Sequence, residues 1–442
     1  MDTTRRNFIA KTGKILAGTG MAGFIPFAPG VAGGRKLSAN DTVVVGLIGC
    51  NGMGFANLTN FVKQPGVECA ALCDVDENVL DRRSKDLLDL TGKKAERYGD
   101  YRKMLERNDI DVVIIGTPDH WHCLQLIDSI AAGKDVYCEK PLANSMHELD
   151  IMVNAARKYN KVVQVGQWQR SGPHWKAAID FVYSGKLGNI RTVKTWAYQG
   201  WMKPVPILPD EAAPAGVDYD LWLGPAHKKP FNRNRFHFNF RWFWDYAGGL
   251  MTDWGVHIID FGLYGMKARA PVSVMASGGK FAYPDDASET PDTLQAIYEF
   301  ENYTMIWEHA TGIDGGPYGK THGVAFIGNN GTLVVDRGGW EVIPEQENGQ
   351  YKMEAIPPQR GGSRDLELHV QNFLECIKTR EKPACDIAIA ANTAKVAHMG
   401  NIAFKTGRKI YWDKNANRFI NDEQANDLMK PYYRDPWKLP QV

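Results

Sequence analysis

Two sets of polar side chains have residue types and spacing that suit proton transfer. Lys140 lies in the run Glu139-Lys140-Pro141, while Asp253 and His257 lie four residues apart in a largely apolar segment. The proline disfavours helical backbone at Lys140 and so restricts where its side chain points. Removal from water disfavours the charged form of a lysine, and histidine has an ordinary pKa of about 6.5, so both groups can exchange protons near neutral pH. We therefore predict that Lys140, Asp253 and His257 are catalytic.

Residues 248–264 are predicted to form the helix that carries Asp253 and His257. Asp260 and Tyr264 continue the same row, so the four polar side chains would share one helix face. Burying such a face costs free energy unless it borders a water-filled cleft. The four side chains are therefore predicted to line an active site, although Asp260 could instead have a structural role.

A glycine-rich turn follows the first apolar strand of the sequence. Residues 42–48 form a continuous apolar run, which is typical of a parallel strand buried on both faces. The turn that follows leads into a helix-like segment, residues 55–64, and it reads Gly49-Cys50-Asn51-Gly52-Met53-Gly54. Such a turn lets backbone amides at a helix N-terminus contact a pyrophosphate. The residues predicted to bind a dinucleotide here are Gly49, Asn51, Gly52, Met53 and Gly54.

Asn51 and Asp74 bear on how the dinucleotide binds and on which one it is. Asn51 stands in place of the usual second glycine, and asparagine tolerates a left-handed backbone better than most residues. Asp74 follows the second predicted strand, where a carboxylate can accept hydrogen bonds from the adenosine ribose. A carboxylate there would repel a 2′-phosphate, which favours NAD over NADP, but Arg82 and Arg83 nearby leave NADP open.

Strand and helix segments alternate up to residue 167, and polar residues follow three successive strands. These strands are residues 112–115, 135–138 and 162–165. In an open parallel sheet, ligands bind beyond the carboxyl ends of the strands. The further cofactor-binding residues predicted there are Thr117, Pro118, His120, His122, Glu139, Lys140 and Gln167.

Three motifs together resemble one known family. They are the run Gly-Thr-Pro-Asp-His-Trp-His at 116–122, the run Tyr-Cys-Glu-Lys-Pro-Leu-Ala at 137–143, and the glycine pair at 248–249 that precedes Asp253-x-x-x-His257. The chain resembles the Gfo/Idh/MocA oxidoreductases, named for glucose-fructose oxidoreductase and inositol dehydrogenase. The resemblance covers essentially everything after the first 40 residues, and Glu-Lys-Pro is its most specific element.

The resemblance implies a nicotinamide cofactor and a sugar, polyol or glycoside substrate. It places Lys140 near the nicotinamide, makes His257 the general base for a substrate hydroxyl, and has Asp253 bind substrate or orient the imidazole. It also implies a homodimer or homotetramer formed through the C-terminal sheet. The residues expected to contact substrate are Trp168, Arg170, Tyr198, Trp244, Asp253 and His257.

The predicted fold class is α/β, with an N-terminal doubly wound parallel sheet of the Rossmann type over residues 40–167. A C-terminal α+β domain over residues 168–410 is expected to contain a large open sheet, mostly antiparallel, with helices on one face. Within it, residues 198–245 form an insertion rich in proline and aromatic residues, whose rings could either bind sugars or simply pack. The tail, residues 411–442, is expected to be polar and irregular and to reach a neighbouring subunit.

Composition excludes several classes of function. Among 442 residues, 52 are Lys or Arg and 51 are Asp or Glu, so no field of one sign is available to bind nucleic acid. No apolar run approaches the roughly 20 residues of a membrane span. The histidines show no spacing typical of zinc enzymes, and no metal is expected.

The first 34 residues resemble a twin-arginine export signal. Arg5 and Arg6 precede a glycine-rich apolar run and a small-residue exit, which is the layout of a secretory segment. We therefore expect a periplasmic protein. Free nicotinamide nucleotides should be scarce there, so the NAD is expected to be tightly bound.

Three functions stay open on the sequence alone. The first is a dehydrogenase or sugar–sugar oxidoreductase, which the intact Glu-Lys-Pro run favours. The second is a redox glycosidase that works through a 3-keto-glycoside. The third is a non-catalytic sugar-binding protein that retains the fold.

Overall fold

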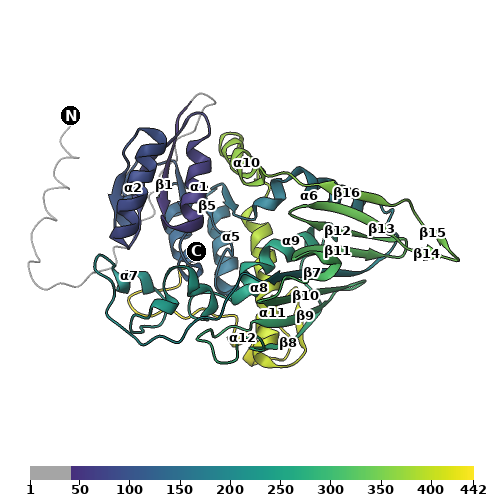
Figure 1. Ribbon diagram of the computed structural model, residues 1–442. Coiled ribbons are helices and arrows are strands. Elements are labelled where there is room, and N and C mark those ends of the chain that lie inside the picture. The colour runs from purple at the N-terminus through teal and green to yellow at the C-terminus, as the bar shows by residue number, and fades with distance from the viewer. Residues whose placement is uncertain (1–40) are drawn as a thin grey trace, which may run out of the picture. The chain divides into compact units, whose positions relative to one another are not determined.

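The computed structural model describes residues 41–442. The predicted export signal lies outside the described residues. The first part of the described chain is a six-stranded parallel sheet in the order β3-β2-β1-β4-β5-β6, the strand order of a dinucleotide-binding Rossmann fold (Figure 1). Its strands are β1 (Val43–Ile48), β2 (Val67–Cys73), β3 (Glu96–Tyr98), β4 (Val112–Ile115), β5 (Asp135–Cys138) and β6 (Val163–Val165).

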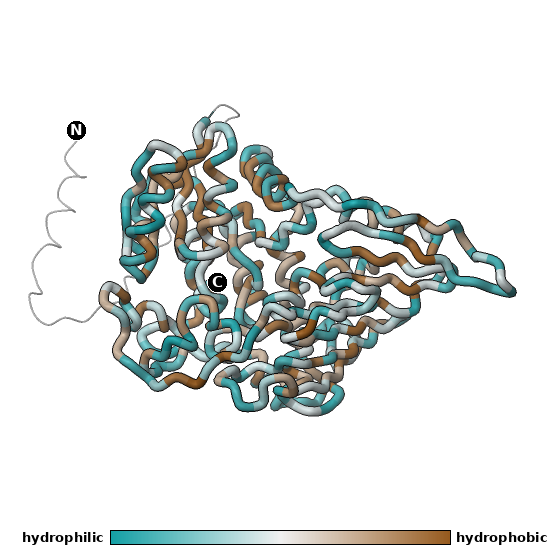
Figure 2. The backbone as a smooth tube through the Cα atoms, in the orientation of Figure 1, coloured by the Kyte–Doolittle hydropathy of each residue, from teal (hydrophilic) through white to brown (hydrophobic). Residues whose placement is uncertain are grey.

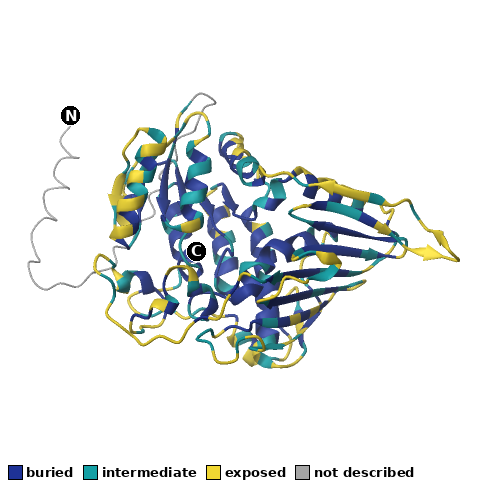
Figure 3. Cartoon of the chain, viewed as in Figure 1, coloured by how far each residue is buried: buried dark blue, intermediate teal, exposed yellow. Residues whose placement is uncertain are grey.

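Five helices alternate with these strands. They are α1 (Gly52–Val62), α2 (Glu77–Thr91), α3 (Tyr101–Leu105), α4 (Asp119–Ala131) and α5 (Met146–Lys158). The strands β4, β5 and β6 are buried along their whole length, as continuous apolar runs require (Figure 3). Helix α4 begins at Asp119, so the polar residues after β4 form its first turn.

The second sheet has ten strands and is antiparallel except for the pair β7 and β10. Its order is β16-β13-β12-β11-β7-β10-β9-β8-β17-β18. The strands are β7 (Ile190–Gln199), β8 (Ser273–Gly279), β9 (Thr293–Glu299), β10 (Thr304–Thr311), β11 (His322–Gly328), β12 (Gly331–Asp336), β13 (Gly339–Pro344), β16 (Ile356–Arg360), β17 (Ile410–Asp413) and β18 (Arg418–Phe419). A separate hairpin, β14 (Gln346–Glu347) and β15 (Gln350–Tyr351), is exposed and hydrophilic at its tip (Figure 2). The predicted α/β fold class with a mostly antiparallel second sheet is therefore confirmed.

Helices pack on one face of this sheet. The helices of this part are α6 (Pro173–Tyr183), α7 (Tyr219–Leu223), α8 (Gly249–Asp253), α9 (Gly255–Gly265), α10 (Asp365–Thr379), α11 (Ile387–Thr406) and α12 (Glu423–Asp427). Short 3-10 turns add η1 (Trp168–Ser171), η2 (Arg233–Arg235), η3 (His237–Trp242) and η4 (Pro317–Gly319). Helices α6, α9 and α11 contact the sheet, and α11 also packs on α5, so it joins the two sheets' cores.

The predicted single helix over 248–264 is wrong. Helix α8 ends at Asp253 and α9 begins at Gly255, with Trp254 between them. Trp254 keeps helical backbone angles and the Ile258 N–H donates to its carbonyl, so Asp253 and His257 both still line the cavity, whereas Asp260 does not. Each of the three side chains has different surroundings.

The tail also differs from the predicted polar, irregular segment. It contains β17, β18 and α12, and its side chains Trp412, Phe419, Met429 and Trp437 are buried. Trp437 packs edge-on against Trp121 with ring centroids 4.9 Å apart.

Candidate active site

A cavity of about 500 Å³ lies at the carboxyl ends of the parallel strands. Its walls come from the turns after β1, β2, β4 and β5, and from α8, α9 and the aromatic insertion. This volume falls within the usual range of ligand-binding pockets. The parallel sheet thus meets the C-terminal domain where ligands are expected to bind.

The glycine turn forms one end of this cavity. Gly49 has a φ of +83°, and a Cβ on Gly54 would lie 2.0 Å from the Gly49 carbonyl oxygen, so α1 can approach β1 only without a side chain there. Gly52 has a φ of +45° and nothing within 4 Å of its Cβ position, which leaves its open side free for a ligand. Asn51 is extended, with a φ of −91°, so the left-handed position belongs to Gly52 and not to Asn51 as the sequence suggested.

Asp74 lies beside this turn. One of its carboxylate oxygens accepts from the Cys50 backbone N–H at 2.7 Å, and the other accepts from the Asp76 N–H at 3.1 Å. Burial raises the pKa of Asp74 to about 6 in spite of these hydrogen bonds. The carboxylate is therefore held in place and ionised at neutral pH, with lone pairs left for ribose hydroxyls.

The aromatic insertion closes over the loop that carries Asp74. The Asp218 N–H donates to the Val75 carbonyl, and the Glu77 N–H donates to the Gly216 carbonyl, both at 2.9 Å. His237 Nε2 lies 3.1 Å from Asp76 Oδ2. The insertion therefore covers the end of the cavity where the adenosine of a dinucleotide would lie.

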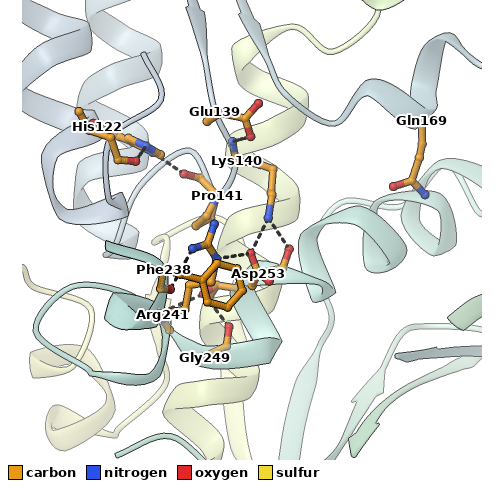
Figure 4. A network of polar contacts seen from close by, with 12 residues as sticks. His122, Glu139, Lys140, Pro141, Gln169, Phe238, Arg241, Gly249 and Asp253 are labelled. Carbon is orange, nitrogen blue, oxygen red and sulfur yellow. Dashed lines mark hydrogen bonds and ion pairs between the residues drawn. The ribbon is translucent and has the colours of Figure 1, made fainter. Parts of the chain in front are cut away.

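Lys140 and Asp253 form an ion pair on one wall of the cavity (Figure 4). Lys140 Nζ donates to Asp253 Oδ1 at 2.6 Å and to the Asp253 carbonyl at 3.1 Å, and Arg241 Nε donates to the same Oδ1 at 3.2 Å. Burial alone would raise the pKa of Asp253, but Lys140 and Arg241 outweigh it and hold that pKa well below its usual range. Asp253 is thus an ionised anchor for two cations.

His257 lines the same wall with its imidazole buried. Burial, together with the positive charges of Lys140 and Arg337, lowers the pKa of His257 well below its usual value. Its Nδ1 has no hydrogen-bond partner among residues 41–442. A neutral imidazole that lines the cavity can accept a proton from a substrate.

Two buried groups hold the Lys140 turn in position. Glu139 accepts from Asn57 Nδ2 at 2.7 Å and from the Lys140 N–H at 3.2 Å. The His122 ring lies between two carbonyl oxygens, 2.7 Å from that of Pro141 and 2.9 Å from that of Thr117. These contacts join the ends of β4 and β5.

The residues present fit an adenine dinucleotide. The glycine turn offers backbone N–H groups at the start of α1 and no side chain to obstruct a pyrophosphate. Asp74 lies at the end of β2, where the ribose of such a cofactor is held, and Lys140 and His257 lie at the opposite wall. When bound, the nicotinamide would supply a hydride acceptor or donor at that wall.

Two family models match the chain. Residues 43–167 match the NAD-binding Rossmann fold of an oxidoreductase family, and residues 187–439 match the C-terminal alpha/beta domain of the same family. The chain belongs to the Gfo/Idh/MocA oxidoreductase family. Its N-terminal domain is accordingly an NAD-binding Rossmann fold.

Curated relatives of this Gfo/Idh/MocA chain align over part of its length. An alpha-N-acetylgalactosaminidase from Shewanella oneidensis is 29% identical over 201 residues, which is 42% of this chain and 44% of the relative. A glycosyl hydrolase family 109 protein from Shewanella baltica is 30% identical over the same shares. The chain thus spans less than half the length of the curated relatives that it matches.

Solved structures share the fold of this Gfo/Idh/MocA chain over most of its length. Aldose-aldose oxidoreductase from Caulobacter crescentus matches with a TM-score of 0.63 and 19% identity, covering 84% of this chain and all of the other. The WlbA dehydrogenase from Bordetella pertussis, solved with NADH and UDP-GlcNAcA, matches with a TM-score of 0.61 and 18% identity, covering 84% and 99%. At these identities the likeness shows the fold alone.

The structure brings most of the predicted residues to the one cavity. Those that line it are Gly49, Asn51, Gly52, Met53, Asp74, Thr117, Pro118, Glu139, Lys140, Trp168, Asp253 and His257. One expected interaction does not form, because no hydrogen bond joins Asp253 to His257 among the described residues. Asp253 instead binds Lys140 and Arg241, which come from two other parts of the chain.

Seven predicted residues do not line the cavity. Gly54 acts through helix packing, and His122 supports the Lys140 turn from behind. His120 is buried against the Trp222 carbonyl, and Gln167 accepts from the Cys385 thiol. These four residues were predicted to bind the cofactor, but they support the cavity without lining it.

Arg170, Tyr198 and Trp244 also lie elsewhere. Arg170 forms a buried double hydrogen bond with Asp260, at 2.6 and 2.9 Å, so its donors are committed within the fold. Tyr198 lies on β7 with its hydroxyl 3.4 Å from a Glu308 oxygen, and Trp244 packs beneath the Lys405 ammonium. The prediction that they bind substrate is therefore not supported.

Three ionisable residues that line the cavity, Asp119, Arg241 and Arg337, are not among the predicted site residues. Asp119 was part of a quoted motif, and burial raises its pKa to about 8, so its carboxyl is largely protonated at neutral pH. Arg241 lies in the insertion rich in proline and aromatic residues, and neither it nor Arg337 has a local sequence signal that points to the cavity. Both arginines reach the cavity through folding of distant segments.

Two absences concern residues 41–442 only. No helix in this range is long and apolar enough to cross a membrane. Nor does this range contain a cluster of three or more histidine, cysteine, aspartate or glutamate side chains able to hold a metal ion.

Proposed function

We propose that this oxidoreductase transfers a hydride between a hydroxyl-bearing carbon of a sugar, polyol or glycoside and a bound NAD. The observation that carries this proposal is the meeting of Lys140 and His257, from two different domains, on a cavity that begins at the glycine turn. A carbohydrate is supported by the aromatic walls of the cavity, which include Trp168, Trp201 and Trp254. Flat apolar faces of sugar rings pack well on such side chains.

The roles of the residues follow from their contacts. His257 is neutral and takes the proton of the reacting hydroxyl. Lys140, held by Asp253, donates a hydrogen bond to the same hydroxyl oxygen, which stabilises the negative charge that develops there. Asp253 forms no hydrogen bond with the His257 imidazole. It accepts hydrogen bonds from Lys140 and Arg241 and so holds both in position.

A redox glycosidase is the second candidate. The curated relatives, which include an alpha-N-acetylgalactosaminidase, favour it. In that reaction, oxidation at C3 acidifies the C2 proton, elimination then breaks the bond to the leaving group, water adds, and the hydride returns to C3. The same cavity would perform the first and last steps.

One assay separates the two candidates. The purified protein is mixed, without added nucleotide, with a panel of sugars and 4-nitrophenyl glycosides. Near-ultraviolet absorbance of reduced nicotinamide without release of nitrophenol supports the dehydrogenase, and release of nitrophenol supports the glycosidase. If no sugar or glycoside of the panel gives either signal, carbohydrate oxidation is contradicted.

We further propose that NAD stays bound between turnovers and that the protein acts in the periplasm as a homodimer or homotetramer. The hydrogen bonds from the insertion to residues 75–77 support retention, because they cover the loop beside Asp74. The uncovered face of the second sheet supports assembly, since Met275 and Ile297 are 41% and 42% exposed on paired strands. Gel filtration with light scattering tests the oligomeric state. Chromatography of the nucleotide released by denaturation tests whether NAD stays bound. Export of a reporter fused to residues 1–34 tests the periplasmic location.

A further inference from the structure

We propose that the substrate carries an anionic oxyacid group, a carboxylate or a sulfate ester, and that Arg337 binds this group between Trp168 and Trp254. The inference rests on the proposed function, because it concerns the substrate of the same cavity. It adds a substrate class, namely acidic sugars, and a residue that selects for it.

Arg337 projects into the cavity from the loop between β12 and β13. Its guanidinium carbon lies 4.6 Å from the centroid of the Trp168 ring and 4.5 Å from that of Trp254. Both rings also lie within 6.3 Å of the His257 ring. The guanidinium is therefore fixed beside the proposed base by two aromatic faces, as cation–π contacts require.

Arg337 lacks the carboxylate partner that neighbouring arginines have. Arg170 pairs with Asp260 and Arg241 pairs with Asp253, but Arg337 forms no ion pair among residues 41–442. In that range its hydrogen bond is from Nη2 to Gln169 Oε1 at 3.3 Å, and its Nε is buried without a partner. An arginine has five N–H donors, so most of them are unused.

Asp253 and Asp365 lie near enough to favour the charge of Arg337, but neither carboxylate is paired with its guanidinium. Burial lowers its pKa to about 10, and the group therefore stays a cation at neutral pH. Asp253 already binds two cations, and the nearby Asp365 does not form an ion pair with Arg337. His257 and His322 have pKa values lowered by burial and are neutral, and each has a ring nitrogen without a protein partner among the described residues.

A fixed guanidinium with free donors is suited to an oxyanion. Arginine binds carboxylate and related groups through two parallel hydrogen bonds. A buried cation gains more interaction energy from such a partner than an exposed one does. The two indole rings offer flat surfaces for the sugar that carries the group. A neutral sugar would leave the Arg337 charge uncompensated, which gives the cavity a preference for acidic substrates.

The test compares matched charged and neutral sugars on the protein with its nucleotide bound. Galacturonic acid is set against its methyl ester, and a sugar 6-sulfate against the unsulfated sugar, with binding followed by tryptophan fluorescence. Arg337→Gln removes the charge and Arg337→Lys retains it. Arg364→Gln is the control, since Arg364 is exposed and pairs with Glu367 on the surface.

We expect the wild-type protein and Arg364→Gln to bind one of the acidic sugars at least roughly tenfold more tightly than its neutral partner. Arg337→Gln should abolish that preference, and Arg337→Lys should keep part of it. The acid that is preferred identifies the group as carboxylate or sulfate. Equal binding of both members of each pair, an unchanged preference in Arg337→Gln, or no saturable binding of any of the four sugars would overturn the inference.

Nicotinamide absorbance recorded in the same samples separates this inference from the proposed function. If sugars reduce the nicotinamide but acid and neutral forms do so equally well, the proposed function stands and the role of Arg337 is wrong. If acidic sugars bind in an Arg337-dependent way and no sugar in a wider panel reduces the nicotinamide, the anion site stands and the proposed function is wrong.

Discussion

Lys140 Nζ lies 2.6 Å from Asp253 Oδ1, and this contact joins the end of β5 in the cofactor domain to the end of α8 in the C-terminal domain. The two side chains are only 13% and 15% exposed, so little water competes for either group. The ion pair fixes the ammonium at the wall that also carries His257. The proposed hydride transfer therefore depends on a contact between the two domains.

Lys140→Met is expected to reduce the rate of nicotinamide reduction by roughly 10²- to 10⁴-fold, because it removes the group that holds the reacting hydroxyl. The nucleotide content should be unchanged, since Lys140 lies at the other end of the cavity from the glycine turn. Lys176→Met is the control, because Lys176 is 68% exposed and lies outside the cavity. Loss of activity that is fully explained by loss of nucleotide would contradict the assigned role.

The pH dependence of the reaction should report His257. Burial and the charges of Lys140 and Arg337 lower its pKa, so the imidazole stays neutral and able to accept a proton below its ordinary pKa. The rate should therefore hold as pH falls toward about 6.5 and decline only below it. Rapid-mixing measurements of nicotinamide reduction give this profile. An acid limb with its midpoint at or above about 6.5 would show that the base is not a depressed histidine.

Asp74 should make nucleotide affinity dependent on pH. Burial raises its pKa to about 6, so the carboxyl is ionised above that pH and protonated below it. Ionised Asp74 accepts hydrogen bonds from ribose, and affinity should fall as pH decreases through about 6. Titration of nucleotide-free protein by fluorescence measures this. Asp74→Asn should weaken binding and remove the dependence, whereas Asp89→Asn, at an exposed site on α2, should change neither.

Two glycines of the turn should respond differently to alanine. In Gly54→Ala the new Cβ would lie 2.0 Å from the Gly49 carbonyl oxygen, so α1 must move and the free energy of unfolding should fall. In Gly52→Ala nothing lies within 4 Å of the Cβ, and the positive φ costs only about 1–2 kcal/mol. Its Cβ points where a pyrophosphate would lie, so nucleotide affinity should suffer more than stability. Urea unfolding measures the stability of both variants, and nucleotide titration measures their affinity. If Gly52→Ala lost stability and kept its nucleotide affinity, the pyrophosphate would have to lie elsewhere.

The Arg170–Asp260 pair should matter for stability and not for substrate. Asp260 is fully buried and also accepts from Thr393 Oγ1 at 2.8 Å. Asp260→Asn leaves the Arg170 charge without its partner, which should cost about 3–5 kcal/mol in the free energy of unfolding. The Michaelis constant for the substrate should be unchanged. A raised Michaelis constant with unchanged stability would restore the sequence-based assignment of Arg170 to substrate binding.

Features that depend on neighbouring residues could be predicted from the sequence. The turn at Gly49–Gly54, the acid at Asp74 and the Glu139-Lys140 pair each follow a recognisable strand, so the rule that ligands bind at strand ends placed them correctly. The pair Asp253 and His257 was found because polar residues are rare in that apolar segment.

Features that depend on distant partners could not be predicted. Arg170 looked available because its partner, Asp260, is 90 residues away in the sequence. Arg337 carries no local signal, and only the fold brings it between Trp168 and Trp254. The division of the helix at Trp254 could not be predicted, because the single glycine that follows, Gly255, does not by itself end a helix.

A crystal structure with NAD bound tests the central claim most directly. We expect the pyrophosphate over the turn formed by Gly49 and Gly52, the adenosine ribose against Asp74, and C4 of the nicotinamide facing a space bordered by Lys140 and His257. A nicotinamide ring that lies away from those two side chains, or a nucleotide bound outside this cavity, would contradict it.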